Sequence, residues 1–326
     1  MNGAPLAAGA IAEAGANTGT GAVRLAVDRH ALQRAFSRAS ARYDAAATLQ
    51  AEVRAELHER LGFFTLAPRR ILDAGCGTGE GTRALRRRFR GARVLGLDLA
   101  HGMLRTARAR TGPWPWPWPW RRLPLVCADV QSLPLPDASL DLVVSNLMLQ
   151  WCDDLPRAFA QLRRALRPGG LLLFSTFGSE TLLELRAAWA AADEFAHVSP
   201  FVDMPSLGAA LAGAGFSEPV LDRELRVQQH ATVRALMDSI RAIGAGNALA
   251  ARRRTLTGTG RLRRMQAAYE AQRTDAGLPA TWEVLYGAAF AGGGDHGRFA
   301  NGAAGGPPGE AQVPLAALRP ARRRQD

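Results

Sequence analysis

The sequence contains no lysine, so all 41 of its Lys and Arg positions are arginine, against 29 acidic residues. It also has no apolar run that approaches the ~20 residues of a membrane-spanning helix. Its first residues lack the charged segment followed by an apolar segment that marks a secretory signal. These absences argue against a membrane-spanning or secreted protein, and we expect a cytoplasmic one. Arginine in place of lysine, in a chain rich in alanine and glycine, indicates genomic base bias as much as selection.

Cysteine is also scarce: the chain has only Cys76, Cys127 and Cys152. No two of them have the spacing of metal ligands, and an odd number argues against a disulfide framework. We therefore predict no metal site, and a reducing environment fits these cysteines.

The formal net charge of +12 favours an acidic partner, such as nucleic acid, a membrane surface or an acidic protein. Much of the excess positive charge lies in four short arginine clusters, at residues 86–90, 252–254, 261–264 and 322–324. A solvated helix face or tail explains each cluster as well as a contact with a partner does. Charge alone therefore identifies no partner.

The 326 residues, 47% of them hydrophobic, are enough for one large domain or two small ones. Residues 1–24 are mostly Ala, Gly, Thr and Asn, and residues 293–326 are rich in Gly, Pro and Ala. We expect a disordered lead and a disordered tail there. One domain is expected over residues 25–292. Its first part, 25–62, has the pattern of two helices, and residues 229–278 have the pattern of a helical cap.

Two segments allow two interpretations each. Residues 36–44 join the two N-terminal helices, either as a plain turn or as a lid over a ligand, with Arg38 and Tyr43 facing that ligand. Residues 114–120 alternate Trp and Pro, which excludes a helix or an interior strand. Such a run is either an adhesive interaction surface or a tolerated loop insertion, and we favour the insertion.

The central motif is Ile71-Leu-Asp-Ala-Gly-Cys-Gly-Thr-Gly79, a short apolar run that ends in an acid and then breaks into glycines. A helical pattern follows from Glu80. A strand, a glycine turn and a helix bring bare backbone and a helix N-terminus against a nucleotide-like ligand. The next expected strand ends in Asp98, where a ribose diol needs an acceptor. Together these features predict a site for a nucleoside cofactor.

Asp73 narrows the choice of cofactor. An acid immediately before the glycines would repel a pyrophosphate, but it would suit a cofactor that carries a cation, such as an amino group or a sulfonium. A glycine turn without a ligand does not account for Asp73 and Asp98 together.

Strands and helices alternate from residue 70 to residue 176, which predicts a parallel, doubly wound α/β sheet. The glycines of Arg167-Pro-Gly-Gly170 should cap a helix, and a fifth strand should follow over Leu171–Thr176. Residues 219–228 are expected as the sixth strand, and residues 281–286 as an antiparallel strand beside it. The helices between these two strands would form a substrate lid.

The motif at residues 71–79 resembles the first motif of class I S-adenosylmethionine-dependent methyltransferases, which have a Rossmann-like, mostly parallel sheet with an antiparallel last strand. The resemblance implies S-adenosylmethionine as the cofactor. It also implies the residues that would bind it: Asp73, Gly75, Gly77 and Gly79 in the loop, Asp98 and Leu99 at the ribose, Met103 at the cofactor edge, Asp129 and Val130 at the adenine, Asn146 beside the methionine end, and Arg38 and Tyr43 on the lid.

Blocks outside the generic cofactor half carry a closer resemblance. They lie at residues 36–44, 145–151, 175–186, 197–201, 244–247 and 278–286. With these blocks the chain resembles the malonyl-acyl carrier protein O-methyltransferases of biotin synthesis over roughly residues 25–290. The lead, the Trp-Pro insert and the tail depart from the family but touch no matched block.

This family resemblance implies methyl transfer from S-adenosylmethionine to the free carboxylate of malonyl-acyl carrier protein, the step that starts pimelate formation. A carboxylate is already ionised at pH 7, so positioning and desolvation can replace a general base. Tyr43, Gln150 and Trp151 are the catalytic candidates, although the last two are equally explained by packing. Arg241 or Arg254 could clamp the substrate carboxylate. His197 is a further substrate-binding candidate, or a structural loop residue.

Three other functions stay open. Complex I assembly arginine hydroxylases carry similar Gly-x-x-Thr-Leu-x-Glu-Leu-Arg and Ser-Pro-Phe blocks, although Gln150-Trp151 and residues 282–284 favour the biotin family. A methyltransferase with a small-molecule acceptor and a non-enzymatic nucleic-acid binder are the others. We expect an acyl carrier protein as partner, docked on the clusters at 252–254 and 261–264, and neither nucleic acid nor a membrane. The sequence does not distinguish a monomer from a homodimer.

Overall fold

The computed structural model describes residues 27–110, 123–250, 252 and 257–292. The expected lead (1–24), the Trp-Pro insert (114–120), Arg254 and the expected tail (293–326) lie outside these residues. Within the described ranges, no helix is both long enough and apolar enough to cross a membrane.

Seven strands form one sheet in the order β3-β2-β1-β4-β5-β7-β6. Strand β7 runs antiparallel to both of its neighbours, and β1 to β5 are mutually parallel. This arrangement confirms the predicted doubly wound, mostly parallel sheet with an antiparallel last strand. The strands are β1 (Arg70–Ala74), β2 (Arg93–Asp98), β3 (Leu125–Cys127), β4 (Leu140–Asn146), β5 (Leu166–Phe177), β6 (Phe216–His230) and β7 (Leu278–Ala291).

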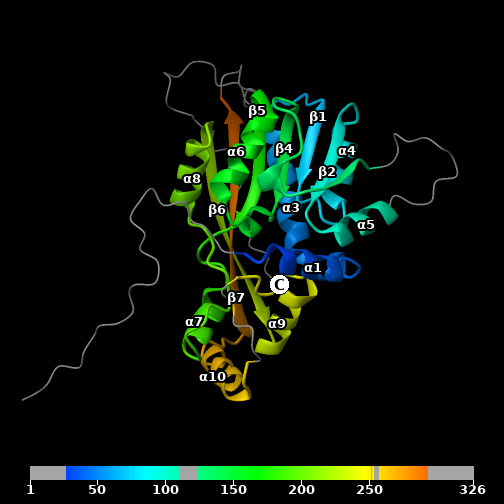
Figure 1. Ribbon diagram of the computed structural model, residues 1–326. Coiled ribbons are helices and arrows are strands. Elements are labelled where there is room, and N and C mark those ends of the chain that lie inside the picture. The colour runs from blue at the N-terminus through cyan, green and yellow to red at the C-terminus, as the bar shows by residue number, and fades with distance from the viewer. Residues whose placement is uncertain (1–26, 111–122, 251, 253–256, 293–326) are drawn as a thin grey trace, which may run out of the picture.

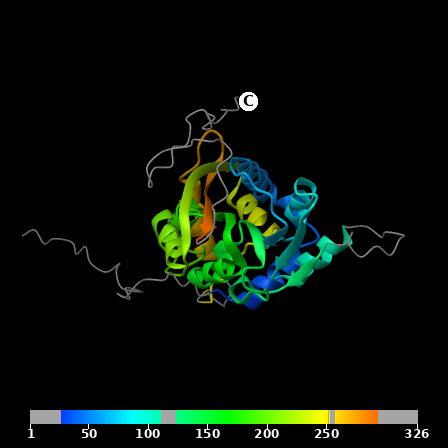
Figure 2. The same ribbon diagram turned by 90° about the horizontal axis from the view of Figure 1, so that it is seen from above.

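Helices cover both faces of the sheet, as the side view and the view from above show (Figures 1 and 2). α3 (Thr48–Arg60) and α4 (Glu80–Arg88) pack on one face, and α6 (Leu155–Ala165) and α8 (Met204–Gly213) pack on the other. In the central strand β1, Ile71 enters the first core and Leu72 enters the second. Burial on both faces explains why the central strands are continuous apolar runs in the sequence.

Strand β5 begins at Leu166, and not at Leu171 as expected. Leu166 pairs with Leu140, and the register shifts before Leu171 pairs with Leu142. Gly169, with φ of 75°, lies inside this irregular part of the strand. The predicted glycine cap of the preceding helix was therefore wrong: α6 ends at Ala165, and the glycines allow the chain to bend within the strand.

The last two strands are longer than the sequence indicated, with 15 residues in β6 and 14 in β7. The next helix after β5 is α7 (Leu183–Ala190). The intervening segment is fixed to β7, because the buried carboxylate of Glu283 accepts a hydrogen bond from the Glu180 N–H at 2.6 Å. The β6–β7 pair thus extends beyond the parallel strands and forms the base of the cap.

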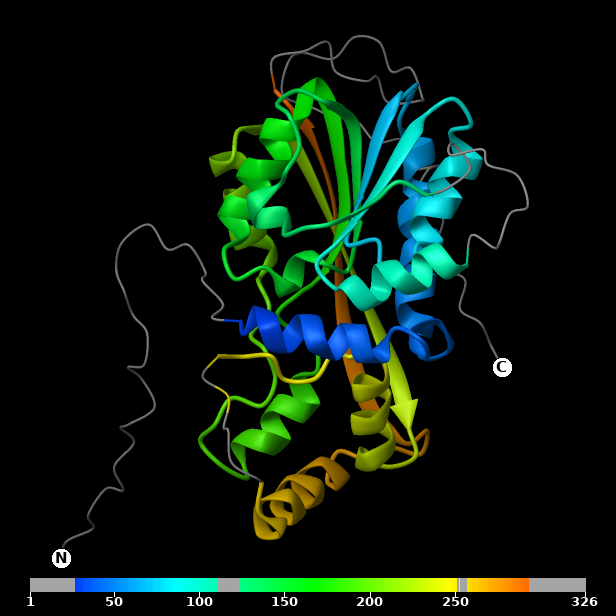
Figure 3. The same cartoon turned by 45° about the vertical axis from the view of Figure 1, so that its right-hand side comes forward.

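Helix α1 (Arg29–Ala39) crosses the carboxyl ends of the parallel strands, between the sheet and the cap (Figure 3). Two glycines pack closely against it: a Cβ at Gly102 would lie 2.6 Å from the Cα of Ser37, and a Cβ at Gly244 would lie 3.2 Å from the carbonyl oxygen of Ala35. The remaining helices are α2 (Tyr43–Ala46), α5 (His101–Ala109), α9 (Val233–Ala242) and α10 (Thr259–Glu270), with 3-10 turns η1 (Leu61–Phe63), η3 (Val130–Ser132) and η4 (Leu149–Trp151).

Candidate active site

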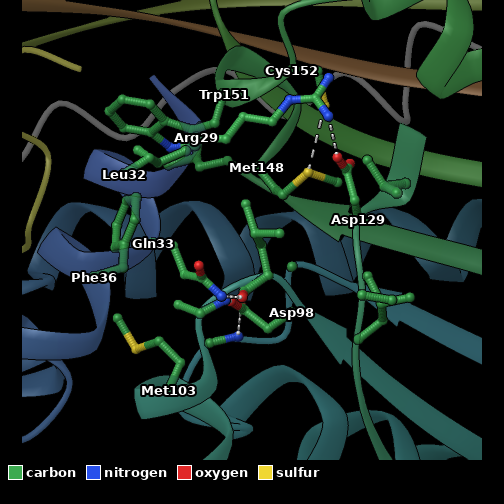
Figure 4. A pocket seen from close by; sticks show the side chains of 18 of the residues that line it. Arg29, Leu32, Gln33, Phe36, Asp98, Met103, Asp129, Met148, Trp151 and Cys152 are labelled. Carbon is green, nitrogen blue, oxygen red and sulfur yellow. Dashed lines mark hydrogen bonds and ion pairs between the residues drawn. The ribbon is translucent and has the colours of Figure 1, made fainter. Parts of the chain in front are cut away.

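A cavity of about 790 Å³ lies between α1 and the carboxyl ends of β1, β2 and β4 (Figure 4). We call it the cofactor cavity, since an open α/β sheet places its ligand at this edge. The predicted residues that line it are Tyr43, Gly75, Gly77, Asp98, Leu99, Met103, Asp129, Val130 and Asn146.

Bare backbone forms one wall of the cofactor cavity. Gly75 and Gly77 have φ of 80° and 53°, a conformation that favours glycine. A Cβ at Gly75 would lie 2.5 Å from the Cβ of Met148, so no side chain fits there. Gly79 also has a positive φ, but it faces Ala107 and Leu123 and does not line the cavity.

The carboxylate of Asp98 is fixed in the cavity by two backbone N–H groups. Its Oδ2 accepts a hydrogen bond from Gly77 at 2.8 Å, and its Oδ1 accepts one from Ala100 at 2.8 Å. Burial raises the pKa of Asp98, while these two bonds oppose the shift. Each oxygen keeps a free lone pair, so the group can also accept the hydroxyls of a ribose.

Asp73 lies behind the glycine loop and does not line the cavity. Its side chain is buried, and its Oδ2 accepts a hydrogen bond from the Thr82 hydroxyl at 2.6 Å. Burial raises the pKa of Asp73 to about 6. A ligand in the cavity would therefore not touch Asp73 directly. The charge of Asp73 would act on such a ligand across the glycine loop.

At the other end of the cavity, Arg29 of α1 bridges two carboxylates. Its Nη1 donates to Asp129 Oδ2 at 2.7 Å (Figure 4). Its Nη2 donates to Asp153 Oδ1 at 2.5 Å. Asp129 Oδ1 accepts a hydrogen bond from the Gln131 N–H at 2.8 Å. These hydrogen bonds from Arg29 and from the Gln131 N–H fix the orientation of the Asp129 carboxylate at the cavity. The contacts of Arg29 also anchor α1 to the sheet.

A second cavity, of about 740 Å³, lies on the cap side of the first. We call it the acceptor cavity. Phe36, Tyr43, Leu147 and Trp151 line both cavities, and the rings of Phe36 and Trp151 meet edge to face with centroids 5.4 Å apart. Its other walls are mostly apolar, and no arginine occurs among the described residues that line it.

Tyr43 stands where the two cavities meet. Burial raises the pKa of its hydroxyl to about 12, and the neighbouring Asp98 carboxylate adds to the shift. The hydroxyl is therefore protonated at physiological pH. It forms no hydrogen bond with any described residue, so its proton is available to a ligand.

The remaining candidates divide by position. Gln150 lines the acceptor cavity, but its amide donates to the Leu147 carbonyl at 2.7 Å and accepts from the Thr176 hydroxyl at 3.3 Å. His197 also lines this cavity, stacked on Trp189 with centroids 3.6 Å apart and with its Nε2 2.8 Å from Asp193. Both side chains are thus held by packing and hydrogen bonds within the protein.

Two predicted arginines do not reach either cavity. The side chain of Arg241 is 64% exposed and pairs with Asp238 at 3.2 Å, so the structure does not bring it to a substrate carboxylate. Arg38 is exposed on the outer face of α1, away from the cofactor cavity. In the described part of the chain, no three His, Cys, Asp or Glu side chains are placed to hold a metal ion.

Sequence reasoning missed Arg29 and Gln33, which line the cofactor cavity from α1. Gln33 donates from Nε2 to the Leu99 carbonyl at 2.9 Å. The available signal was Asp28, a residue type that begins helices, which accepts a hydrogen bond from the Ala31 N–H and fixes the start of α1. From that start, residues 29, 32, 33 and 36 fall on one helix face.

A protein-family model described as "Methyltransferase domain" matches residues 72–174. The malonyl-[acyl-carrier protein] O-methyltransferase of Methylovorus sp. (strain MP688) is 47% identical over 264 residues, which cover 81% of this chain and 89% of that protein. The protein with the same description from Xylella fastidiosa (strain M23) is 50% identical over 266 residues, with coverage of 81% and 88%.

Among solved structures, the YcgJ protein of Bacillus subtilis superposes with a TM-score of 0.51 at 16% identity. The superposition covers 73% of this chain and 98% of that one. At this identity the likeness concerns the fold alone, and it agrees with the sheet described above. The sequence matches, in contrast, cover about four fifths of this chain at close to half identity.

Proposed function

This chain belongs to the malonyl-[acyl-carrier protein] O-methyltransferase family, and we propose that it transfers a methyl group from S-adenosylmethionine to the free carboxylate of malonyl-acyl carrier protein. The product is the methyl ester that starts pimelate formation in biotin synthesis. One structural observation carries the proposal: a cavity suited to a nucleoside and an apolar cavity meet at the unpaired hydroxyl of Tyr43.

The cofactor cavity fits S-adenosylmethionine on three counts. Because Met148 packs closely against Gly75, the glycine loop presents only its backbone to the cavity at that point. Asp98 offers two carboxylate oxygens to ribose hydroxyls, and Asp129 offers an acceptor for the adenine amino group. When bound, the cofactor supplies a methyl group on a positively charged sulfur, which is an electrophile for a carboxylate.

The residues of the acceptor cavity would orient the substrate carboxylate and exclude water from it. Tyr43 can donate one hydrogen bond to it without neutralising it, because the phenol stays uncharged. The apolar walls, including Phe36, Leu147 and Trp151, remove water from the carboxylate, and a desolvated anion is a stronger nucleophile. An arginine clamp would stabilise the anion and slow its attack, so the absence of arginine from the described lining agrees with this chemistry.

Methyl transfer from labelled S-adenosylmethionine to purified malonyl-acyl carrier protein tests the proposed function. We expect one methyl group per carrier and loss of the free carboxylate, read by mass spectrometry of the thioester arm. Complementation of a biotin auxotroph that lacks this step is the matching test in cells. Methylation of a small-molecule acceptor with no transfer to malonyl-acyl carrier protein would instead identify another methyltransferase activity.

The pKa of Asp73 predicts how cofactor binding depends on pH. A carboxyl group with its pKa raised to about 6 becomes ionised as the pH rises through that value. A cationic ligand nearby favours the ionised form, so its affinity should rise with pH, by about 10-fold between pH 5 and pH 7.5. The positive charge of Arg54 lowers the pKa of Asp73, and the carboxylate of Asp98 raises it.

Calorimetric titrations at both pH values provide the measurement. S-adenosylhomocysteine, whose sulfur is neutral, should change in affinity by less than about 3-fold over the same range. Asp73→Asn should remove most of the pH dependence. Equal slopes for the two ligands would show that Asp73 does not sense the sulfonium charge.

For the carrier protein we propose a docking surface on α1. Arg34 and Arg38 lie four residues apart on α1, which places them on one side of the helix, and Arg42 follows in the turn before α2. All three side chains are exposed, and none forms an ion pair or hydrogen bond within the described residues. In contrast, the clusters at residues 252–254 and 261–264 contain arginines that are engaged within the protein. Arg252 pairs with Asp28 at 2.9 Å, and Arg264 donates to the Ala192 carbonyl at 2.9 Å.

Charge reversal tests this surface. Arg34→Glu/Arg38→Glu should raise the KM for malonyl-acyl carrier protein by about 10-fold and leave kcat within about 2-fold, because rim charges steer encounter. Arg87→Glu/Arg90→Glu, which makes the same charge change on exposed residues at α4, is the matched control. An equal rise in KM for the control pair would assign the effect to net charge and not to α1.

A further inference from the structure

A third cavity, of about 820 Å³, adjoins the acceptor cavity and shares part of its lining. We call it the side crevice. It lies between the junction of α2 and α3, helix α9, the end of β6 and the start of β7. The side chains that line both the crevice and the acceptor cavity are Gln50, Ile240, Ile243 and Trp282.

Two polar groups in the wall of the crevice have no partner. Trp282 is only 6% exposed, and its indole Nε1 is buried with no hydrogen-bond acceptor among the described residues. The Nε2 of His230 is likewise buried and unpaired in this part of the chain. A buried polar group without a partner is destabilising and rare in folded proteins, so two in one cavity are unusual unless a ligand pairs with them.

The chemistry of these two groups is complementary to an amide. An indole N–H only donates hydrogen bonds. Burial lowers the pKa of His230, so its ring is neutral at pH 7 and Nε2 can accept. Gln228, Gln229 and Ser239 add further donors and acceptors around them. The crevice therefore suits a slender ligand that carries amide groups, and it differs in this from the apolar acceptor cavity.

The proposed substrate has such a part. A malonyl thioester is joined to its carrier protein by a flexible arm with two amide groups, and this arm must reach from the carrier surface to the buried carboxylate. Arg42, at the end of the proposed docking surface, is the N-cap residue of α2, and Ala46 at the other end of α2 lines the crevice. The docking surface and the crevice are thus connected by one short helix.

We propose that the side crevice binds the amide-containing arm of the carrier protein, with the Trp282 N–H donating to an amide carbonyl and His230 Nε2 accepting from an amide N–H. This inference rests on the proposed function, because it assumes a carrier-bound acyl group. It gives the arm a binding site separate from both the cofactor cavity and the carboxylate.

Binding of carrier protein with and without its arm tests the inference independently of methyl transfer. Wild-type protein should bind the arm-bearing holo-carrier about 10-fold more tightly than the apo-carrier, which lacks the arm. Ser239→Trp places an indole at the exposed edge of the crevice and should abolish this difference. Ala235→Trp adds the same group one turn away on α9, outside the crevice lining, and should preserve it. An unchanged preference for holo-carrier in Ser239→Trp would overturn the inference.

Kinetics with two substrates provide the second test. His230→Phe, at a position that lines the crevice and not the acceptor cavity, keeps an aromatic ring but removes the acceptor nitrogen, and it should raise the KM for malonyl-acyl carrier protein about 5-fold. The S-methyl thioester of malonate has no arm, and its turnover should change less than 2-fold. Equal losses on both substrates would contradict the inference. If the wild-type protein methylates neither substrate, the proposed function fails, whereas the comparison of holo- and apo-carrier still reports on the crevice.

Discussion

Replacing Asp98 with alanine should weaken the binding of S-adenosylmethionine by about 100-fold or more. The substitution removes the acceptors for the ribose hydroxyls. It also removes the two bonds that fix the glycine loop and the start of α5, through Gly77 and Ala100. Both losses act on the cofactor cavity, so their effects on affinity should add.

Isothermal titration calorimetry with S-adenosylmethionine and S-adenosylhomocysteine gives the measurement. Asp98→Asn, which keeps one acceptor oxygen, should lose only about 10-fold. Thermal unfolding of both variants separates lost affinity from lost folding. Near-normal affinity for S-adenosylmethionine in a folded Asp98→Ala protein would show that Asp98 does not bind the cofactor.

Replacing Tyr43 with phenylalanine should lower kcat for malonyl-acyl carrier protein by about 100-fold, because the hydroxyl would orient the carboxylate toward the methyl group and its loss would misplace the attacking oxygen. The ring that lines both cavities remains, and only the donor at their junction is lost. Because the hydroxyl has a pKa of about 12, wild-type kcat should be independent of pH between about 6.5 and 9.

Single-turnover methyl transfer measures this effect on the chemical step. The affinity for S-adenosylmethionine should change by less than about 3-fold in Tyr43→Phe, since the expected loss concerns the acceptor. Gln150→Leu is an informative comparison, because both ends of that amide are bonded within the protein. A larger loss of kcat in Gln150→Leu than in Tyr43→Phe would assign the donor role to Gln150.

The parts of the fold that the sequence predicted well are those with local causes. A short apolar run identified β1, and the glycines after it identified the turn that approaches a ligand. Asp98 was placed correctly at the end of β2 and in the cavity, because the ends of parallel strands meet at one edge of a sheet.

The features of the site that the sequence did not reveal have long-range causes. Asp73 follows the same strand pattern, but the start of α4 covers it, and only the packed structure reveals its bond to Thr82. The placement of Arg241 rested on its position in the cap, whereas side-chain direction on α9 decides that it faces solvent. The contacts of Arg29 with Asp129 and Asp153 span more than a hundred residues of sequence, a distance over which no local pattern carries information.

The edge-to-face pair of Phe36 and Trp151 has a thermodynamic consequence. One ring comes from α1 and the other from the turn after β4, and both rings line both cavities. A ligand that moves this pair in one cavity therefore alters the shape of the other. Linkage then requires reciprocity: whatever factor the cofactor imposes on the affinity for the acyl substrate, the substrate must impose the same factor on the affinity for the cofactor.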